Sequence, residues 1–193
     1  FLYEIGYNKG ETFWDRFVVR VAPAENNLPY REASRINIHR DTWGTNLYQQ
    51  INWWAPVSNV EEKNTMIFYP DYFDVPVKNT TSTWDLNIYL ANRKKGDFSY
   101  PSAPQLKEDL PSNIKKIPVT IKPGEILCFS GAHLHSSSKE KSENTRISFE
   151  IRTICENDLN SSAQAPNVDC DLQWKFPKIF KKINDNSPLK ITS

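Results

Sequence analysis

The sequence contains few residues that bind metals or form disulfides, and it has no long apolar run. Its 193 residues include three cysteines, three histidines and one methionine. The cysteines (Cys128, Cys155 and Cys170) lack the Cys-x-x-Cys spacing of zinc ribbons and dithiol redox motifs. Their odd number is typical of reduced thiols in a cytoplasmic protein, with a Cys155–Cys170 pair as the alternative. No segment has the length and hydropathy of a membrane span.

An excess of charge of either sign is also missing. The 24 basic and 23 acidic residues leave a formal net charge of +1, and the basic residues form no block or stripe. Composition therefore gives no support for a nucleic-acid or membrane-surface partner. The chain begins at Phe1 rather than Met, which leaves a trimmed N-terminus open.

Aromatic residues are plentiful, with six Trp, eight Tyr and ten Phe. Because aromatic and β-branched residues favour strands, residues 13–21, 47–57, 65–69 and 146–154 are the best strand candidates. Residues 117–121 and 125–129 flank a Pro-Gly turn and predict a hairpin-like pair. Many short strands separated by Gly, Pro and Asn predict a mainly β fold, a β-sandwich or jelly roll with few short helices.

The length suits a single domain spanning residues 1–193. Residues 92–116 are polar and contain three prolines, so we expect an excursion over the surface there. Residues 157–193 are expected to form an irregular C-terminal wrap, with a short helix near residues 175–183. Residues 84–90 fit either a strand or a helical turn.

One motif, His39-Arg40-Asp41, places an imidazole and a carboxylate two residues apart. In an extended chain, side chains two residues apart lie on the same side, so His39 and Asp41 would face one site. Two histidines and one carboxylate form the facial triad that holds non-haem Fe(II) and leaves positions open. A lone His-x-Asp pair is more often a hydrogen-bonded surface pair, so a third ligand is needed.

That third ligand comes from His133 or His135, the only other histidines, and spacing alone does not choose between them. Arg146 lies eleven residues after His135, and Ser148 lies two residues after Arg146. In a strand these two side chains point the same way, and a guanidinium with a hydroxyl is a good receptor for a carboxylate. The alternative is that Arg146 forms a salt bridge on a strand face, as we expect for Arg152, and that Ser148 is only a small strand residue.

Together these residues resemble the Fe(II)/2-oxoglutarate-dependent dioxygenases, and they are most similar to the phytanoyl-CoA dioxygenase-like branch. The resemblance runs from about His39 to Thr153 and includes the segment 123–129, Pro-Gly-Glu-Ile-Leu-Cys-Phe. It implies a double-stranded β-helix, with Fe(II), 2-oxoglutarate as co-substrate and O2. It also implies that His39, Asp41 and His135 bind the iron, and that Arg146 binds the distal carboxylate of 2-oxoglutarate with help from Ser148.

The sequence departs from that branch at two places. Only 38 residues precede His39, and the segment after Tyr69 lacks the Gly-Ser-His that often follows the proline there. The substrate is therefore not transferable from the family, and hydroxylation and desaturation both stay open.

Further pocket candidates come from the aromatic strand. Period-two geometry puts Gln49, Ile51 and Trp53 on one face, and Gln50, Asn52 and Trp54 on the other. We select Gln49 as a contact for the keto acid, and Trp43, Trp53 and His133 as substrate contacts. The plain alternative is that the tryptophans are core residues and that His133 is an ordinary loop histidine.

The leading hypothesis is an oxygenase that hydroxylates a small-molecule or carrier-linked substrate and decarboxylates 2-oxoglutarate to succinate. The second hypothesis is a cupin-like metalloprotein with the same ligands and no keto acid, in which Arg146 has no required role. The third is a non-catalytic jelly-roll module in which Trp43, Trp53 and Trp54 bind a ligand. The oligomeric state is not readable from the sequence.

Overall fold

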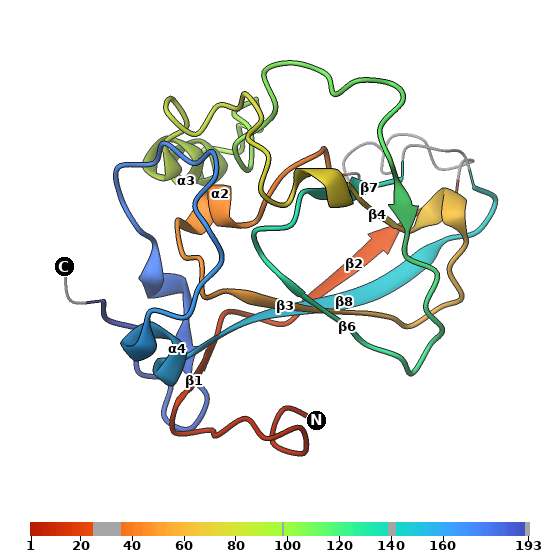
Figure 1. The fold of residues 1–193 in the computed structure, drawn as a ribbon. Helices are drawn as coiled ribbons and strands as arrows, with labels where there is room; N and C mark the ends of the chain where they lie inside the picture. Colours follow the sequence, from red (N-terminus) through yellow and green to blue (C-terminus); the bar gives the residue numbers. More distant parts are fainter. Residues whose placement is uncertain (25–35, 98, 139–141, 192–193) are drawn as a thin grey trace.

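The computed structural model describes residues 1–24, 36–97, 99–138 and 142–191, which form two antiparallel β-sheets with short helices around them (Figure 1). The larger sheet contains β1 (Thr12–Trp14), β2 (Val18–Ala22), β3 (Ile51–Pro56), β6 (Leu127–Ser130), β8 (Arg146–Cys155) and β9 (Lys181–Lys182). The smaller sheet contains β4 (Met66–Phe68), β5 (Ile117–Pro118) and β7 (His135–Ser137). The predicted mainly β, double-stranded β-helix fold is confirmed.

The long strand β8 organises the larger sheet, whose order is β6-β3-β8-β1-β9. Both β1 and β2 pair with β8 in antiparallel fashion, β1 along residues 153–155 and β2 along residues 146–150. The single strand predicted over residues 13–21 is therefore two strands. The break between them falls at Asp15, whose carboxylate accepts hydrogen bonds from the backbone and side chain of Arg152.

The predicted hairpin between residues 117–121 and 125–129 is wrong. Strand β5 pairs with β4 in the smaller sheet, whereas β6 pairs with β3 in the larger sheet. The chain crosses from one sheet to the other through a turn at Gly124, which has a φ of +96° that glycine tolerates best. Pro118 and Pro123 lack the N–H groups that a continuous hairpin ladder would require.

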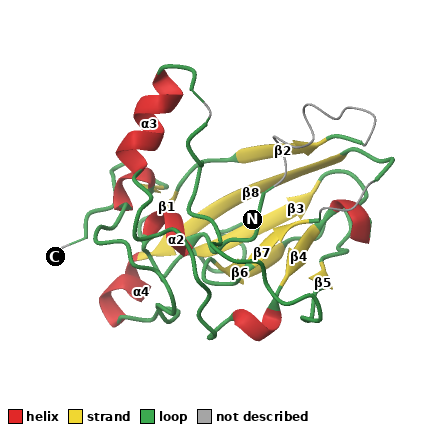
Figure 2. Ribbon diagram, turned by 90° about the horizontal axis from the view of Figure 1, so that it is seen from above, coloured by secondary structure: helices red, strands yellow, loops and turns green. Residues whose placement is uncertain are grey.

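The helices lie outside the sheets. They are α2 (Thr42–Thr45), α3 (Leu86–Lys94) and α4 (Glu156–Ser161), with 3-10 turns η2 (Glu62–Asn64), η3 (Pro70–Tyr72) and η4 (Pro177–Ile179). The segment 84–90, which fitted strand or helix, is helical because Asp85 caps α3 by accepting hydrogen bonds from the N–H groups of Asn87 and Ile88. Figure 2 shows α3 at the periphery. Among the described residues, no helix has the length and apolar character needed to cross a membrane.

The C-terminal residues are partly regular. The predicted short helix over residues 175–183 is reduced to η4, and β9 follows it and pairs with β1. Phe180 is fully buried in a cluster with Phe13, Leu47, Ile154 and Leu189. All three cysteines are free thiols, so the alternative Cys155–Cys170 disulfide does not form.

Strand β8 has the reverse of the usual pattern of buried residues. Its side chains at 146, 148, 150 and 152 are polar or charged, and Arg146, Glu150 and Arg152 line the interior pocket. The intervening Ile147 is 37% exposed on the outer face. Strands normally bury their apolar face, so a polar interior face indicates that the space between the sheets is a binding site rather than only a core.

Candidate metal centre

His39 and His135 are brought together by backbone pairing. The N–H of each residue donates to the carbonyl of the other, at 2.9 Å and 3.0 Å, which forms an isolated antiparallel bridge at the edge of the smaller sheet. Directly paired antiparallel residues hold their side chains close together. The two imidazole rings consequently lie with their centroids 4.3 Å apart.

Asp41 joins them through a turn, not through the extended geometry that we expected. Its φ and ψ are −64° and −30°, and it stands immediately before the helix α2. Its Oδ1 lies 3.8 Å from Nε2 of His39, and its Oδ2 lies 3.6 Å from Nε2 of His135. One donor atom from each of the three residues lies within 4.8 Å of the others, so the three side chains surround one point.

The tautomer of each imidazole follows from its other ring nitrogen. Nδ1 of His39 pairs with the carbonyl of Asn37 at 2.8 Å, and Nδ1 of His135 pairs with the carbonyl of His133 at 2.9 Å. A carbonyl only accepts, so each Nδ1 carries the proton and each Nε2 presents its lone pair toward Asp41. This is the arrangement that a metal-binding imidazole needs.

The charge states also suit a cation. Burial, together with the nearby His135, lowers the pKa of His39 to about 4, so this ring is neutral at neutral pH. Burial pushes the pKa of Asp41 upward, but His135, His39 and Arg152 and the hydrogen bond from Asn52 outweigh it, and the pKa lies below its ordinary value. Two imidazole nitrogens and one carboxylate on one side of a point form the donor set of the facial triad that holds Fe(II).

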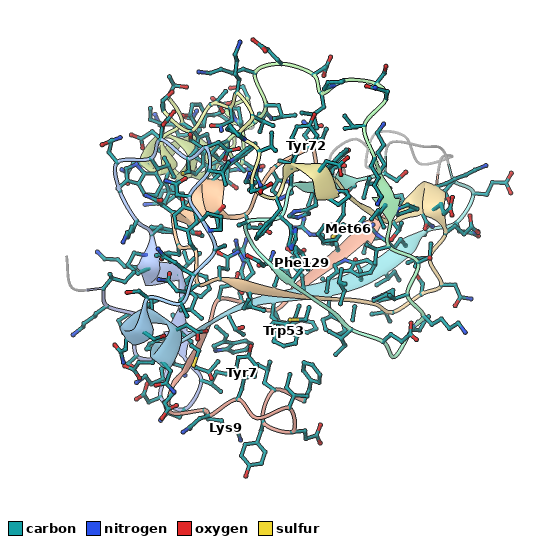
Figure 3. All side chains as sticks on the ribbon, in the orientation of Figure 1. Tyr7, Lys9, Trp53, Met66, Tyr72 and Phe129 are labelled. Atoms are coloured by element: carbon teal, nitrogen blue, oxygen red, sulfur yellow. The ribbon has the colours of Figure 1, made fainter. Side chains whose placement is uncertain are left out.

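The triad opens into a pocket between the two sheets. Its empty space, the open mouth included, is about 480 Å³, and its apolar walls include Trp54, Met66 and Phe129. Figure 3 shows Met66 and Phe129 on the same side of the larger sheet, facing the space between the sheets. A divalent cation held by the triad would therefore have its open positions on the pocket side.

Arg146 lines the same pocket and has no acidic partner among the described residues. Its exposure is 3%, and its Nε has no hydrogen-bond partner. The hydroxyl of Ser148, two residues along the same face of β8, is fully buried and also lacks a partner. Ser148 does not itself line the pocket, whereas Arg146 does. Buried polar atoms are almost always satisfied, so the orphaned Nε of Arg146 indicates a missing polar ligand on the pocket side. Burial and the nearby Arg20 lower the pKa of Arg146 to about 10.

The other charged groups of the pocket form ion pairs. Arg20 binds Glu150 through two hydrogen bonds of 3.0 Å and 2.6 Å. Arg152 pairs with Asp15 at 2.6 Å, as expected for a salt-bridge residue, and its Nη1 also lies 3.9 Å from Oδ1 of Asp41. The sequence reasoning did not select Arg20 or Glu150. The period-two alternation that begins at Arg146 could have indicated Glu150, but nothing in the sequence placed β2 beside β8.

His133 and Trp43 lie outside the triad and do not line the pocket. The ring of His133 lies 4.5 Å from that of Phe73, and burial lowers its pKa. Trp43 is fully buried, and its indole N–H donates to Asp169 at 2.7 Å. The structure therefore places Trp43 in the core and His133 beside the triad, with its backbone carbonyl orienting His135.

The division of β3 into two faces is observed, but the inner face is the one that we did not select. Asn52 and Trp54 line the pocket, whereas the amide of Gln49 binds Gln164 near the surface. Trp53 borders the pocket, yet its indole points to the other side of the sheet, where it packs 5.5 Å from Tyr7 and donates to Thr153 (Figure 3). In this segment the sequence reasoning also missed Gln50 and Asn52, whose amides lead to Asp41.

Comparison with known proteins finds likeness in fold only. No family model matches the chain, and no curated protein matches it. Among solved structures, EvdO2 from Micromonospora carbonacea var. aurantiaca is 11% identical with a TM-score of 0.51, covering 80% of this chain and 56% of its own. It is also known in complex with 2-oxoglutarate.

Two further solved structures are similar at lower scores. The non-haem monooxygenase ThoJ is 14% identical with a TM-score of 0.49, covering 76% of this chain and 47% of its own. The epimerase SnoN, in complex with Fe3+, alpha ketoglutarate and nogalamycin RO, is 14% identical with a TM-score of 0.48. The match covers 75% of this chain and 50% of the SnoN chain. The chain spans about half the length of these structures. It shares its double-stranded β-helix fold with EvdO2 and carries a His-Asp-His site on that fold.

Proposed function

We propose that this chain is a non-haem Fe(II)- and 2-oxoglutarate-dependent oxygenase of the phytanoyl-CoA dioxygenase-like branch. It would hydroxylate a small-molecule or carrier-linked substrate while 2-oxoglutarate is decarboxylated to succinate. His39, Asp41 and His135 would hold the iron, and Arg146 would bind the co-substrate with Ser148. We expect a cytoplasmic protein with no nucleic-acid or membrane partner, because its thiols are free and its charges are balanced.

The observation that carries the proposal is Arg146, which has no acidic partner within the part of the chain that the structure describes. Burying a guanidinium without a partner is unfavourable, and a binding site is the usual reason that such a group is kept. A carboxylate accepts two parallel hydrogen bonds from a guanidinium, and the free hydroxyl of Ser148 lies on the same strand face to add a third. A pocket ligand with a carboxylate at one end would satisfy the guanidinium of Arg146, with Ser148 behind it on the same strand.

The balance of charge favours a dicarboxylate. The pairs Arg20–Glu150 and Arg152–Asp15 are neutral as pairs, which leaves Asp41 and Arg146 as one negative and one positive charge. A divalent metal ion would then give the pocket two positive charges. A dianion such as 2-oxoglutarate neutralises them, with one carboxylate at Arg146 and the keto-acid end at the open side of the triad.

Each group of the chain then has a separate task. When bound, iron with a keto acid supplies the oxidising chemistry, and the protein supplies binding, orientation and electrostatics. The carbonyls of Asn37 and His133 keep both imidazole lone pairs turned inward. Trp54, Met66 and Phe129 form an apolar wall that excludes water, while Arg20 and Glu150 give the more open side a polar rim.

The proposal is tested by anaerobic titration with Fe(II) and 2-oxoglutarate, followed by visible absorption. The wild type is expected to develop the weak charge-transfer band of an iron-bound keto acid. His135→Ala removes a triad nitrogen and should abolish the band. His133→Ala is the matched control, because it removes a ring only two residues away that lies outside the triad and leaves the carbonyl in place.

The outcomes separate the alternatives. A band that survives His133→Ala and disappears with His135→Ala supports the proposal. Iron binding without any band would favour a metalloprotein that uses no keto acid. Absence of both iron binding and band would favour the non-catalytic ligand-binding module.

A further inference from the structure

We propose that a one-way hydrogen-bond relay, Thr45–Gln50–Asn52, positions the metal-binding carboxylate of Asp41. The hydroxyl of Thr45 donates to Oε1 of Gln50 at 3.1 Å, and Nε2 of Gln50 donates to Oδ1 of Asn52 at 2.8 Å. The amide of Asn52 then donates to Oδ2 of Asp41. The relay rests on the proposed function only in that Asp41 binds a metal.

The relay is fully inside the protein. Thr45, Gln50 and Asn52 are 2%, 0% and 5% exposed. Polar groups buried this deeply need partners, and here each group finds its partner in the next member. The relay also crosses two elements, since Thr45 ends the helix α2 that follows Asp41, whereas Asn52 lies in β3.

The direction of the hydrogen bonds fixes the orientation of both amides. The N–H of Leu47 donates to the Thr45 hydroxyl at 3.4 Å, which leaves the hydroxyl hydrogen free to point at Gln50. Every following donor points toward Asp41, so all the dipoles favour a negative charge on that carboxylate. A flipped amide at Gln50 or Asn52 would place two acceptors or two donors against each other.

Gly131 makes the space that the relay needs. A Cβ at this position would lie 2.7 Å from Nε2 and 3.2 Å from Cδ of Gln50. The backbone of Gly131 is also held in place, because its N–H donates to the carbonyl of Gln50 and its carbonyl accepts from Thr42. An alanine at 131 would therefore press first on the Gln50 amide and displace it.

Asn52 has a specific effect on the metal site. By donating to Oδ2, it leaves Oδ1 as the oxygen with no amide partner, which would favour coordination of a cation through Oδ1 alone. Coordination through one oxygen preserves an open position that two-oxygen coordination would fill. Partners of this kind orient metal ligands, and their loss commonly weakens metal affinity about 10- to 100-fold.

Co(II), bound anaerobically without 2-oxoglutarate, tests the relay through its affinity and its visible d–d bands. Asn52→Leu is expected to weaken Co(II) binding about 10- to 100-fold and to shift the bands. Gly131→Ala and Thr45→Val should change the Co(II) affinity and the d–d bands in the same direction as Asn52→Leu, but by less. These two variants keep the test valid if Asn52→Leu does not fold. Gln49→Leu is the matched control, since Gln49 neighbours Gln50 but binds Gln164 outside the relay.

A double variant separates a relay from independent contacts. If the residues act in series, Asn52→Leu combined with Gln50→Leu should cost no more affinity than Asn52→Leu alone. Wild-type affinity and bands in folded Asn52→Leu and Gly131→Ala would overturn the relay, as would an equal loss in Gln49→Leu. Because Co(II) is used alone, failure of the relay is distinct from failure of the 2-oxoglutarate titration, which tests the proposed function.

Discussion

Replacing Arg146 with methionine should stabilise the metal-free protein while removing its affinity for 2-oxoglutarate. The arginine is 3% exposed and has no acidic partner among the described residues. The guanidinium carbon lies 5.9 Å from the ring centre of Trp54, and methionine offers an unbranched apolar side chain of similar length to pack against that ring. The substitution therefore removes an unfavourable buried charge at little cost in packing.

The magnitude follows from the displaced pKa of the guanidinium. Burial and the neighbouring Arg20 lower this pKa from 12.5 to about 10. At about 1.4 kcal/mol per pKa unit, the buried charge costs on the order of 3 kcal/mol. With some loss of contacts, we expect a net gain of roughly 1–3 kcal/mol, or about 2–12 °C in Tm for a chain of this size.

Urea unfolding and thermal unfolding of the metal-free proteins measure the gain. Arg152→Met is the matched control, because Arg152 lies on the same face of β8 but pairs with Asp15, whose side chain is 3% exposed. Loss of that partner leaves a buried carboxylate uncompensated and should destabilise the protein by about 3–5 kcal/mol. Arg146→Met should also lose the stabilisation that 2-oxoglutarate gives to the iron-loaded wild type.

A fall in stability for Arg146→Met, comparable with that of Arg152→Met, would refute the reasoning. It would mean that Arg146 is a structural residue with a favourable environment in the empty protein. Retained stabilisation by 2-oxoglutarate would equally refute its assignment as the carboxylate receptor.

Two further predictions concern stability. Asp169 accepts hydrogen bonds from Arg40 at 3.1 Å and from the indole of Trp43. Asp169→Ala should lower the free energy of unfolding in urea by about 3–5 kcal/mol, because it leaves the buried Arg40 without its carboxylate. A loss below about 1 kcal/mol would contradict this. His39 has a pKa of about 4 when folded and 6.5 otherwise, so the unfolded chain binds more protons between these values. The metal-free protein should therefore lose up to about 3 kcal/mol as pH falls from 6.5 to 4, and His39→Gln should flatten this slope.

The fold could be predicted because its signals are local. Aromatic and β-branched runs gave β3, β4 and β8 to within a few residues, and the turn residues between them excluded a helical protein. Long-range pairing could not be predicted in the same way. The segments on either side of Pro123-Gly124 have the pattern of a hairpin, yet each finds a better partner in a different sheet.

For the candidate site too, local sequence patterns were predictive, whereas the contacts between distant segments were not. The spacing indicated His39 and Asp41 with either His133 or His135, and the family resemblance implied His135 and the role of Arg146. The structure brings His39, Asp41 and His135 together and places Arg146 in the same pocket. It did not indicate how Asp41 reaches the site, because the turn into α2 is set by contacts with β7 and the loop before it. It also gave no reason to prefer Asn52 over Gln49, since period-two alternation defines two faces without saying which one is interior.

The measurement that tests the central claim most directly is the conversion of 2-oxoglutarate to succinate by the iron-loaded protein in the presence of O2. Even without a substrate, slow turnover should release succinate in proportion to the 2-oxoglutarate consumed, and Arg146→Met should form none above a protein-free control. If iron-loaded wild type also forms no succinate above that control, the chain is not a 2-oxoglutarate-dependent oxygenase.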